Sequence, residues 1–508
     1  MKLQPRYFLL PFAALLLGHA APAPAQAQTL TIALRQDADI LDPTLARTYV
    51  GRIVFAGLCD KLFDIDAKLN IVPQLATGYK WDDPTTLTIT LRPGVLFQNG
   101  EKLDAAAVVT SIARHQELKG SFRRGELAPV KSVEVIDPLT VRVHLKSPYS
   151  PLLYQFTDRA GMIMAPAALT KLGRDFSQHP VCAGPFSFKE RVAQDHITLD
   201  RFPGYWNAKD IHFDRVTYRV LSDTSTRLAN LQSGAVDMAE QIVPTDIAAV
   251  KADPRLMLVT GDGLGYNGVS FNLDNGPRAD TPMGKDVRVR KAFELAIDRK
   301  ALLHVVYNDM YNATAQGVPA GSPYADPTLQ PPARDIAKAK ALLKAAGVKT
   351  PFPVELIAPN IPDLAQVAEV IQAMTAEAGF DVKIQLMEFA SSLQAQTAGN
   401  YQAYIVGWSG RADPDGNLYG TFRTGGPRNA SHYSNPEMDT LLDKARSVTD
   451  LAERKAIYAK VYRIGERDLP YIYLWTTANV MGLNRKLQGF VLVPDGMVRL
   501  QGMHFAKQ

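Results

Sequence analysis

Short apolar strands alternate with helices after Asn272, and this alternation restricts the fold more than any other feature of the sequence. The segments are, in order, Pro353–Ala358 (strand), Leu364–Ala378 (helix), Val382–Glu388 (strand), Ser391–Ala398 (helix) and Tyr401–Val406 (strand). Because the connections between them are short, the pattern predicts βαβ units on a mostly parallel sheet. Further helices are predicted over Asp286–Tyr307, Ile336–Ala346, Pro436–Ser447 and Ala452–Asp468.

The sequence before Asn272 has a different pattern, in which strands and turns predominate. Apolar and polar residues alternate in short segments between Leu58 and Leu145 and in the region from Phe186 to Asn272, as they do in half-buried strands. The other predicted elements are an opening strand (Thr29–Leu34), two helices (Asp104–His115 and Thr224–Ser233) and a β-rich tail (Tyr471–Leu474 and Phe490–Val493). We therefore expect two lobes, with a chain that crosses between them more than once.

The composition is that of a globular protein and does not favour a nucleic-acid binder. The 508 residues are 46% hydrophobic and 21% charged, which excludes a disordered or fibrous chain. The net charge of +5 comes from 56 basic and 51 acidic side chains. Without residues 1–27, which contain Lys2 and Arg6 and no acid, it becomes 54 minus 51, or +3. A nucleic-acid binder would show clustered Lys and Arg instead.

The segment Met1–Ala27 has the three parts of a secretory signal. Lys2 and Arg6 form a basic start, Phe8–Leu17 is apolar, and Ala25-Gln26-Ala27 is a small-residue cleavage site. The apolar part is too short to span the ~30 Å hydrocarbon core of a membrane. No cysteine lies directly after it, so we expect a cleaved, soluble, exported protein without a lipid anchor. An uncleaved membrane anchor is the alternative.

The mature chain keeps two cysteines, Cys59 and Cys182. An even number of cysteines in an exported chain favours a disulfide between them, and two buried free thiols are the alternative. Because no C-x-x-C pair is present, a redox enzyme or a cysteine-ligated metal site is disfavoured.

No motif predicts a cofactor, a metal ion or a catalytic group. The stretch from Gly263 to Gly268 matches G-x-G-x-x-G, but the next residues resemble a strand where a dinucleotide site needs a helix. We interpret these glycines as a close approach to a hinge strand. Histidines at zinc-site spacing, a G-x-S-x-G element and a Walker A sequence are all missing.

The stretch from Gly407 to Arg411 is the best candidate for binding. It follows the predicted strand Tyr401–Val406, and ligands of open α/β sheets bind at the carboxyl ends of strands. Trp408 offers a flat apolar wall, and Arg411 offers a guanidinium fork for a carboxylate. The alternative is a surface turn with a packed tryptophan. Asp413–Asn417 is likewise interpreted as a turn.

With these residues in hand, the chain resembles an extracellular solute-binding protein of bacterial ABC importers, family 5, the peptide/nickel type. The resemblance depends on the order and spacing of short stretches across the mature chain. These are Leu41-Asp42-Pro43, Val72–Ala76, Trp81, Leu91–Gly100, Asp104–Val109, Ala183–Phe186, Arg201, Tyr205-Trp206, Val287–Ala292 and Ala296–Arg299.

The resemblance implies an α/β, two-lobed periplasmic-binding-protein fold of type II with an extra strand-rich inserted domain. Lobe I would comprise 28–60, 186–275 and 478–508; the inserted domain 61–185; and lobe II 276–477. The hinge strands would lie near Val269–Asn272 and Leu474–Val480. Capture by hinge closure needs no second subunit, so a monomer is expected.

The resemblance also implies a function: capture of a peptide or peptide-like solute and its delivery to a membrane ABC permease. In dipeptide binders an Asp after the Gly-Trp pair holds the ammonium group of the peptide, whereas this chain has Arg411 in that neighbourhood and Asp413 next to it. We therefore expect Trp408 as an apolar wall, Arg411 as a carboxylate partner and Asp413 as an ammonium partner. Further candidates are Asn272, Tyr49 and Asp37.

Other ligands and another class of protein stay open at this point. Within the family the solute is alternatively an opine-like conjugate, an oligosaccharide, a nickel chelate or haem. The rival from another class is an exported hydrolase, for which the sequence offers no nucleophile and no paired carboxylates.

Overall fold

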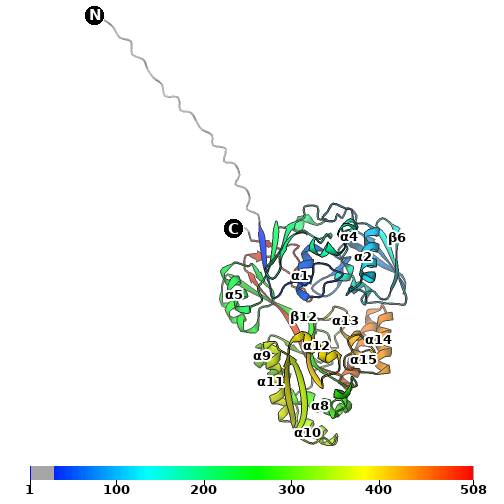
Figure 1. The fold of residues 1–508 in the computed structure, drawn as a ribbon, viewed down its shortest axis with the longest axis vertical. Helices are drawn as coiled ribbons and strands as arrows, with labels where there is room; N and C mark the ends of the chain where they lie inside the picture. The colour runs from blue at the N-terminus through cyan, green and yellow to red at the C-terminus, as the bar shows by residue number, and fades with distance from the viewer. Residues whose placement is uncertain (2–27, 507–508) are drawn as a thin grey trace.

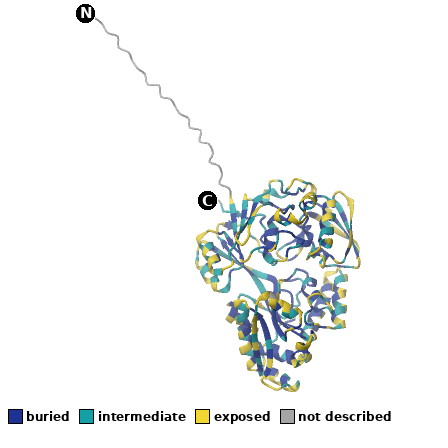
Figure 2. Ribbon diagram, in the orientation of Figure 1, coloured by how far each residue is buried: buried dark blue, intermediate teal, exposed yellow. Residues whose placement is uncertain are grey.

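The computed structural model describes residues 1 and 28–506, so the predicted export signal lies almost entirely outside the described residues. The described chain forms two bodies joined by two long strands, β12 (Leu256–Phe271) and β17 (Tyr471–Asn484) (Figure 1). We call the upper body in this view lobe I and the lower body lobe II. Buried residues gather inside each of them (Figure 2).

One eleven-stranded sheet runs through both lobes. Its order is β15-β14-β16-β12-β17-β11-β1-β10-β9-β8, and β13 adds to β17. Because β12 and β17 pair antiparallel from Leu256↔Asn484 to Ser270↔Tyr471, the connection between the lobes is a two-stranded ribbon. The predicted segment Leu474–Val480 lies within β17, and Val269–Asn272 overlaps the end of β12.

Lobe I contains the amino-terminal strand and the end of the chain. In it β1 pairs parallel with both β10 and β11. Its elements are β1 (Thr29–Leu34), α1 (Tyr49–Leu58), β8 (Phe186–Val192), β9 (His196–Arg201), η3 (Ala208–Asp210), β10 (Arg215–Val220), α5 (Thr224–Ser233), β11 (Met238–Ala239), η4 (Pro244–Asp246), α6 (Ile247–Ala252), β18 (Leu487–Gln488) and β19 (His504–Phe505).

A strand-rich unit is attached to lobe I and shares its core. A four-stranded antiparallel sheet, in the order β4-β5-β7-β6, packs its inward residues Val141 and Val143 into the same apolar cluster as Leu30 and Ile32 of β1. The elements of this unit are β2 (Phe63–Ile65), β3 (Ile71–Pro73), β4 (Ala76–Asp83), β5 (Thr86–Leu91), α2 (Ala105–Glu117), β6 (Val130–Asp137), β7 (Thr140–Leu145), α3 (Leu152–Gln155), η1 (Arg159–Gly161), α4 (Pro166–Leu172) and η2 (Gly173–Gln178).

Lobe II confirms the predicted βαβ pattern. Strand β14 pairs parallel with β15 and β16, and β16 pairs antiparallel with β12 at the junction with the ribbon. Its elements are η5 (Pro277–Ala279), α7 (Pro282–Lys285), α8 (Val287–Ala296), α9 (Arg299–Tyr307), β13 (Asn312–Ala313), α10 (Ile336–Ala345), β14 (Phe352–Pro359), α11 (Pro362–Ala376), β15 (Phe380–Met387), α12 (Phe389–Thr397), β16 (Ala403–Trp408), α13 (Asp415–Phe422), α14 (Pro436–Ser447) and α15 (Leu451–Asp468). Within the described residues, no helix combines the length and apolar character that crossing a bilayer requires.

Three local predictions were wrong. The single helix predicted over Asp286–Tyr307 is two helices, because Ile297 is extended and the Asp298 carboxylate caps α9 by accepting from the Ala301 N–H at 3.0 Å. The turn predicted over Asp413–Asn417 becomes helix α13 from Asp415 onward. Finally, Phe490–Val493 forms no strand, and its irregular chain packs Phe490 and Leu492 against the core of lobe I.

A disulfide and a buried carboxyl lie together where α1 meets the strand-rich unit. Cys59 and Cys182 are bonded, with an S–S distance of 2.07 Å. Next to this disulfide, Asp60 is 1% exposed and accepts hydrogen bonds from neutral donors. These are Tyr205 Oη at 2.9 Å, Trp206 Nε1 at 2.8 Å and Gln74 Nε2 at 3.0 Å. Burial raises the pKa of Asp60 to about 7, against the opposing effect of the Trp206 and Tyr205 hydrogen bonds.

We expect Asp60→Asn to flatten the pH dependence of folding stability between about pH 4 and pH 7. The folded protein holds the Asp60 proton up to about pH 7, whereas an aspartate of the unfolded chain releases its proton near pH 3.9. The raised pKa of Asp60 therefore contributes its full stabilisation of the folded state below about pH 4. This contribution is lost as the pH rises to about 7, at up to about 1.4 kcal/mol per pH unit. Denaturant unfolding at stepped pH measures this slope.

Asp175→Asn, at an exposed position in η2, controls for the loss of one negative charge. Equal slopes for wild-type protein and Asp60→Asn would contradict the assignment.

Candidate functional site

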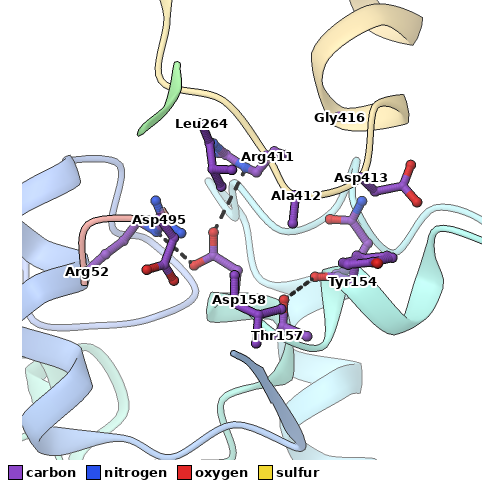
Figure 3. Close-up of a pocket in the computed structure, with 12 residues that line it drawn as sticks. Arg52, Tyr154, Thr157, Asp158, Leu264, Arg411, Ala412, Asp413, Gly416 and Asp495 are labelled. Atoms are coloured by element: carbon purple, nitrogen blue, oxygen red, sulfur yellow. Dashed lines mark hydrogen bonds and ion pairs between the residues drawn. The ribbon is translucent and has the colours of Figure 1, made fainter. Parts of the chain in front are cut away.

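The candidate site lies between the lobes beside the connecting ribbon. Two cavities of about 30 Å³ and about 170 Å³ adjoin there, and Leu264 of β12 and Asp495 line both. In the smaller cavity Arg52 and Asp158 of lobe I face Arg411 of lobe II (Figure 3). Residues of both lobes line each cavity, which is the arrangement that capture by hinge closure requires.

The glycine-rich stretch shapes the floor of this cleft. Pairing between β12 and β17 shifts from Asp262 to Tyr266, so Gly263-Leu264-Gly265 forms an irregular segment within the ribbon. A Cβ atom on Gly263 or Gly265 would lie 2.7 Å from Oγ1 of Thr477. These glycines therefore permit a close approach of the two strands and leave the Leu264 side chain facing the cleft.

Arg411 and Trp408 are positioned by one buried side chain, Asn417 of α13. Its Oδ1 accepts the main-chain N–H of Arg411 at 2.7 Å and the indole Nε1–H of Trp408 at 3.1 Å. Its Nδ2 donates to the Arg411 carbonyl at 3.1 Å. Gly410 completes the loop. Its φ is +75° and a Cβ atom there would overlap the carbonyl of Leu264, so this position favours glycine. The loop is therefore fixed before any solute binds.

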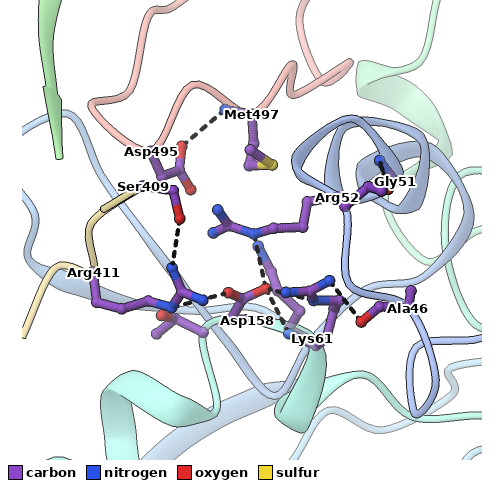
Figure 4. A network of polar contacts seen from close by, with 12 residues as sticks. Ala46, Gly51, Arg52, Lys61, Asp158, Ser409, Arg411, Asp495 and Met497 are labelled. Carbon is purple, nitrogen blue, oxygen red and sulfur yellow. Dashed lines mark hydrogen bonds and ion pairs between the residues drawn. The ribbon is translucent and has the colours of Figure 1, made fainter. Parts of the chain in front are cut away.

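An excess of arginine surrounds the Asp158 carboxylate. Arg52 Nε donates to Asp158 Oδ1 at 3.1 Å, and Arg159 Nε lies 3.7 Å from the same oxygen. From the other lobe, Arg411 Nε lies 3.9 Å from Asp158 Oδ2 (Figure 4). Three guanidinium groups thus share one carboxylate, and the pair between Arg411 and Asp158 joins the two lobes.

The pKa values follow from this arrangement. Burial alone would raise the pKa of Asp158, but Arg52, Arg159 and Arg411 hold it well below its ordinary value. Burial, and then repulsion from Arg52, lowers the pKa of Arg411 to about 10, so Arg411 is still a cation at neutral pH. The cleft therefore presents positive charge to an incoming solute.

The larger cavity contains Tyr49, one of the predicted residues. The Arg35 guanidinium lies 5.2 Å from the centre of the Tyr49 ring and 3.4 Å from Glu240 Oε1. Tyr311 faces this cavity from lobe II. The cavity thus combines aromatic walls with a cation that is already paired.

The structure does not place the other predicted residues beside Trp408 and Arg411 as free ligand contacts. Asp413 lines the smaller cavity but is 2% exposed, and both of its oxygens accept from Arg454, at 2.7 and 3.0 Å. Asn272 is 1% exposed and donates to carbonyls of lobe II. Asp37 binds Arg191 Nη2 at 3.0 Å and lines neither cavity of the cleft.

Several residues of the site were missed by sequence reasoning, notably Arg52, Asp158, Asn417 and Asp495. Arg52 could have been noticed, because it is an arginine within an otherwise apolar helix, Tyr49–Leu58. Asp158 and Asp495 lie in irregular segments, and only the folded chain brings them together with Arg52. Within the described residues, no group of three or more His, Cys, Asp or Glu side chains is arranged to hold a metal ion.

The lobes also touch at the side of the cleft away from the ribbon. The Ser150 N–H donates to the Arg446 carbonyl at 2.7 Å, and Ser150 Oγ donates to the Ala445 carbonyl at 3.2 Å. The Arg446 guanidinium lies 5.2 Å from the centre of the Tyr149 ring. The structure therefore shows the lobes in contact, with the candidate site enclosed between this contact and the ribbon.

Known proteins share both the sequence and the fold. The model of the bacterial extracellular solute-binding proteins, family 5, matches residues 70–430. The glutathione-binding protein GsiB of Salmonella paratyphi A is 31% identical over 490 residues, 94% of each chain.

Two solved structures are similar over nearly the whole chain. The periplasmic binding protein DppA of Helicobacter pylori, in complex with the peptide STSA, has a TM-score of 0.81 and 25% identity, covering 94% of this chain and 98% of that one. AgaA of A. tumefaciens R10, in complex with agropinic acid, has a TM-score of 0.80 and 26% identity, covering 94% and 99%. The chain belongs to the bacterial extracellular solute-binding proteins, family 5, and has their two-lobed α/β fold.

Proposed function

We propose that the protein is the periplasmic solute-binding component of an ABC importer and captures a peptide-like solute that carries a carboxylate. The observation that carries this proposal is the position of Arg411. Its guanidinium extends across the cleft, whereas the nearest carboxylate, Asp158, is bound more closely by Arg52. A solute carboxylate would supply the close, charge-assisted partner that Arg411 lacks among the described residues.

The named relatives support an acidic, peptide-like ligand. GsiB is named for glutathione, DppA is in complex with a peptide, and AgaA is in complex with agropinic acid. Each of these ligands has at least one carboxylate. Glutathione, which has two, is the first ligand to test.

Each predicted site residue receives a role in this proposal. Trp408 is the apolar wall and Arg411 the carboxylate partner, while Tyr49 lines the adjoining cavity. Asp413, through Arg454, and Asn272, through the carbonyls it binds, support the loops of lobe II. Asp37 supports lobe I through Arg191.

Capture proceeds by closure of the lobes around the hinge ribbon. When Arg411 approaches lobe I, the solute carboxylate is shielded from water, and its attraction to the guanidinium strengthens as the local dielectric constant falls. The contact of Ser150 with Ala445 and Arg446 then forms on the other side of the cleft and favours the closed state. We propose lobe I as 28–60, 186–275 and 478–508, its inserted domain as 61–185, and lobe II as 276–477.

We expect Arg411→Glu to abolish binding of glutathione. Arg411→Gln, which keeps similar bulk without the charge, should weaken binding about 10- to 100-fold, because a hydrogen bond to a charged group contributes about 1.5–3 kcal/mol. Isothermal titration calorimetry of the mature, ligand-free protein measures both. Arg255→Gln, an exposed arginine of lobe I paired with Asp253, is the matched control. Unchanged affinity in Arg411→Glu would remove Arg411 from the site.

A thermal-unfolding panel separates the alternatives. It contains di- to pentapeptides, glutathione, an opine-like acid, oligosaccharides, nickel chelates and haem. A ligand at 100 times its dissociation constant stabilises the fold by about 2.7 kcal/mol. If only an oligosaccharide or haem stabilises the fold, that ligand takes the place of the peptide-like solute in the proposal. Turnover of a chromogenic peptide would favour the exported hydrolase.

We expect Ser150→Ala to raise the dissociation constant about 2- to 10-fold, because one hydrogen bond of the closed state contributes about 0.5–1.5 kcal/mol. The effect should appear as faster dissociation in stopped-flow measurements, with little change in the unfolding of the ligand-free protein. The control is Ser233→Ala, whose hydroxyl donates to the Asn230 carbonyl within lobe I. Equal dissociation rates in wild-type protein and Ser150→Ala would show that this contact does not stabilise the closed state.

A further inference from the structure

A third cavity, of about 650 Å³, lies beside Trp408 and is larger than the two in the cleft. Side chains of β12, β16, α12 and the loop from Gly426 to His432 line it, and Arg47 reaches it from lobe I. We call it the Trp408 chamber and define it by Arg47, Tyr266, Val406, Trp408, Arg428 and Tyr471. The capture of a carboxylate at Arg411 makes no use of it.

The floor of the Trp408 chamber is aromatic and rigid. The rings of Tyr266 and Tyr471 meet edge to face with centroids 5.8 Å apart. Tyr471 Oη donates to the Val406 carbonyl at 2.5 Å, and Tyr266 Oη donates to the Asn417 carbonyl at 3.2 Å. The phenol groups are therefore occupied, and the chamber offers ring surface to an apolar or aromatic group.

The charge in the Trp408 chamber is positive and has no carboxylate partner among the described residues. Arg428 lies 4.3 Å from the centre of the Trp408 ring and donates to the Gly416 carbonyl at 2.9 Å. The Arg47 guanidinium lies 4.5 Å from the centre of the Phe122 ring. In the described part of the chain neither side chain forms an ion pair, and no Asp or Glu lines the chamber. Arg446 and Arg454 of the same lobe, by contrast, each bind an aspartate within 2.7 Å.

The main chain at Ala46 and Arg47 is held within lobe I, while the Arg47 side chain lines a cavity that lobe II also lines. The Ala46 carbonyl accepts from Arg159 Nη1 at 2.9 Å and from Arg123 Nη2 at 3.3 Å. The Arg47 N–H donates to Asp39 Oδ2 at 2.7 Å. An anion held between Arg47 and Arg428 would therefore bridge the lobes, as an anion at Arg411 does.

We propose that the Trp408 chamber is a second carboxylate-binding subsite, which takes an acidic group on an apolar or aromatic stem. The inference builds on the proposed function and makes the solute more specific: it carries two anionic groups, one at Arg411 and one between Arg47 and Arg428. Trp408 adjoins both positions, since the Arg411 guanidinium lies 5.1 Å and the Arg428 guanidinium 4.3 Å from its ring centre.

The test uses benzoate, a carboxylate on an aromatic ring, as a probe that does not depend on the identity of the solute. Benzoate is titrated at millimolar concentrations into the mature protein and followed by calorimetry and by saturation-transfer NMR. The variants are Arg428→Gln, Arg47→Gln, the double variant and Arg411→Gln, with Arg255→Gln as control. Arg47 is exposed, so its variant stays informative if Arg428→Gln lowers the thermal stability. Glutathione is titrated into the same variants.

We expect each single chamber variant to weaken benzoate binding about 5-fold or more, as the loss of a charge-assisted partner does. The double variant should weaken it further, and Arg255→Gln should leave it within about 2-fold of wild type. Glutathione affinity should fall in the chamber variants as well as in Arg411→Gln. Absence of benzoate binding to wild-type protein, or equal binding to the double variant, overturns the proposal.

The two proposals fail in different ways. If glutathione and peptides bind through Arg411 while benzoate does not bind, the second subsite is contradicted and the proposed function is supported. If benzoate binds as expected but no peptide-like acid binds, the second subsite is supported and the proposal of a peptide-like solute is contradicted.

Discussion

The pairing of β12 with β17 is the constraint on which the rest of this structure depends. These two strands carry the chain between the lobes, and each also belongs to the sheet on both sides. A ribbon of two hydrogen-bonded strands resists stretching but bends where its pairing is interrupted. The interruption from Asp262 to Tyr266 lies beside the cleft. The glycines that permit it also bring Leu264 against Gly410, so the flexible point of the ribbon and the position of Arg411 come from the same few residues.

The arrangement of charged side chains in the cleft favours ligand binding more than it favours folding stability. A buried ion pair is neutral or costly for folding unless its partners are well matched. Three arginines around Asp158 are not matched, and the resulting positive charge is held in place by the fold. The matched pairs lie just behind the site, where Arg454 holds Asp413 and Arg446 holds Asp415. These pairs fix the loop and the start of α13 and leave Arg411 with a weaker partner. Of the three arginines around Asp158, Arg52 and Arg411 line the smaller cavity of the cleft.

Much of the fold could be predicted from the sequence, because it depends on local periodicity. The β-strands and helices of lobe II have apolar faces that the pattern reveals, and the helix predicted around Thr224–Ser233 is α5. Trp408 and Arg411 could be singled out because they follow a strand end. Asp158 and Asn417 could not, since their roles come from partners 106 and 9 residues away that only the fold brings together. The break at Ile297 also escaped, because apolar periodicity continues through it while Asp298 caps a new helix.

Asn417 links the two proposed anion-binding positions. Its side chain binds both the main chain of Arg411 and the indole of Trp408, and its carbonyl accepts from Tyr266 in the floor of the Trp408 chamber. Trp408 and the main chain of Arg411 are thus fixed from inside lobe II, whereas the side chains of Arg411 and Arg428 line the cavities. Substitution at those two positions, both in loops, can change the charge presented to a solute without replacing the side chain of Asn417. One fold can in this way serve solutes of different charge, because selectivity lies in a few loop residues and closure lies in the ribbon.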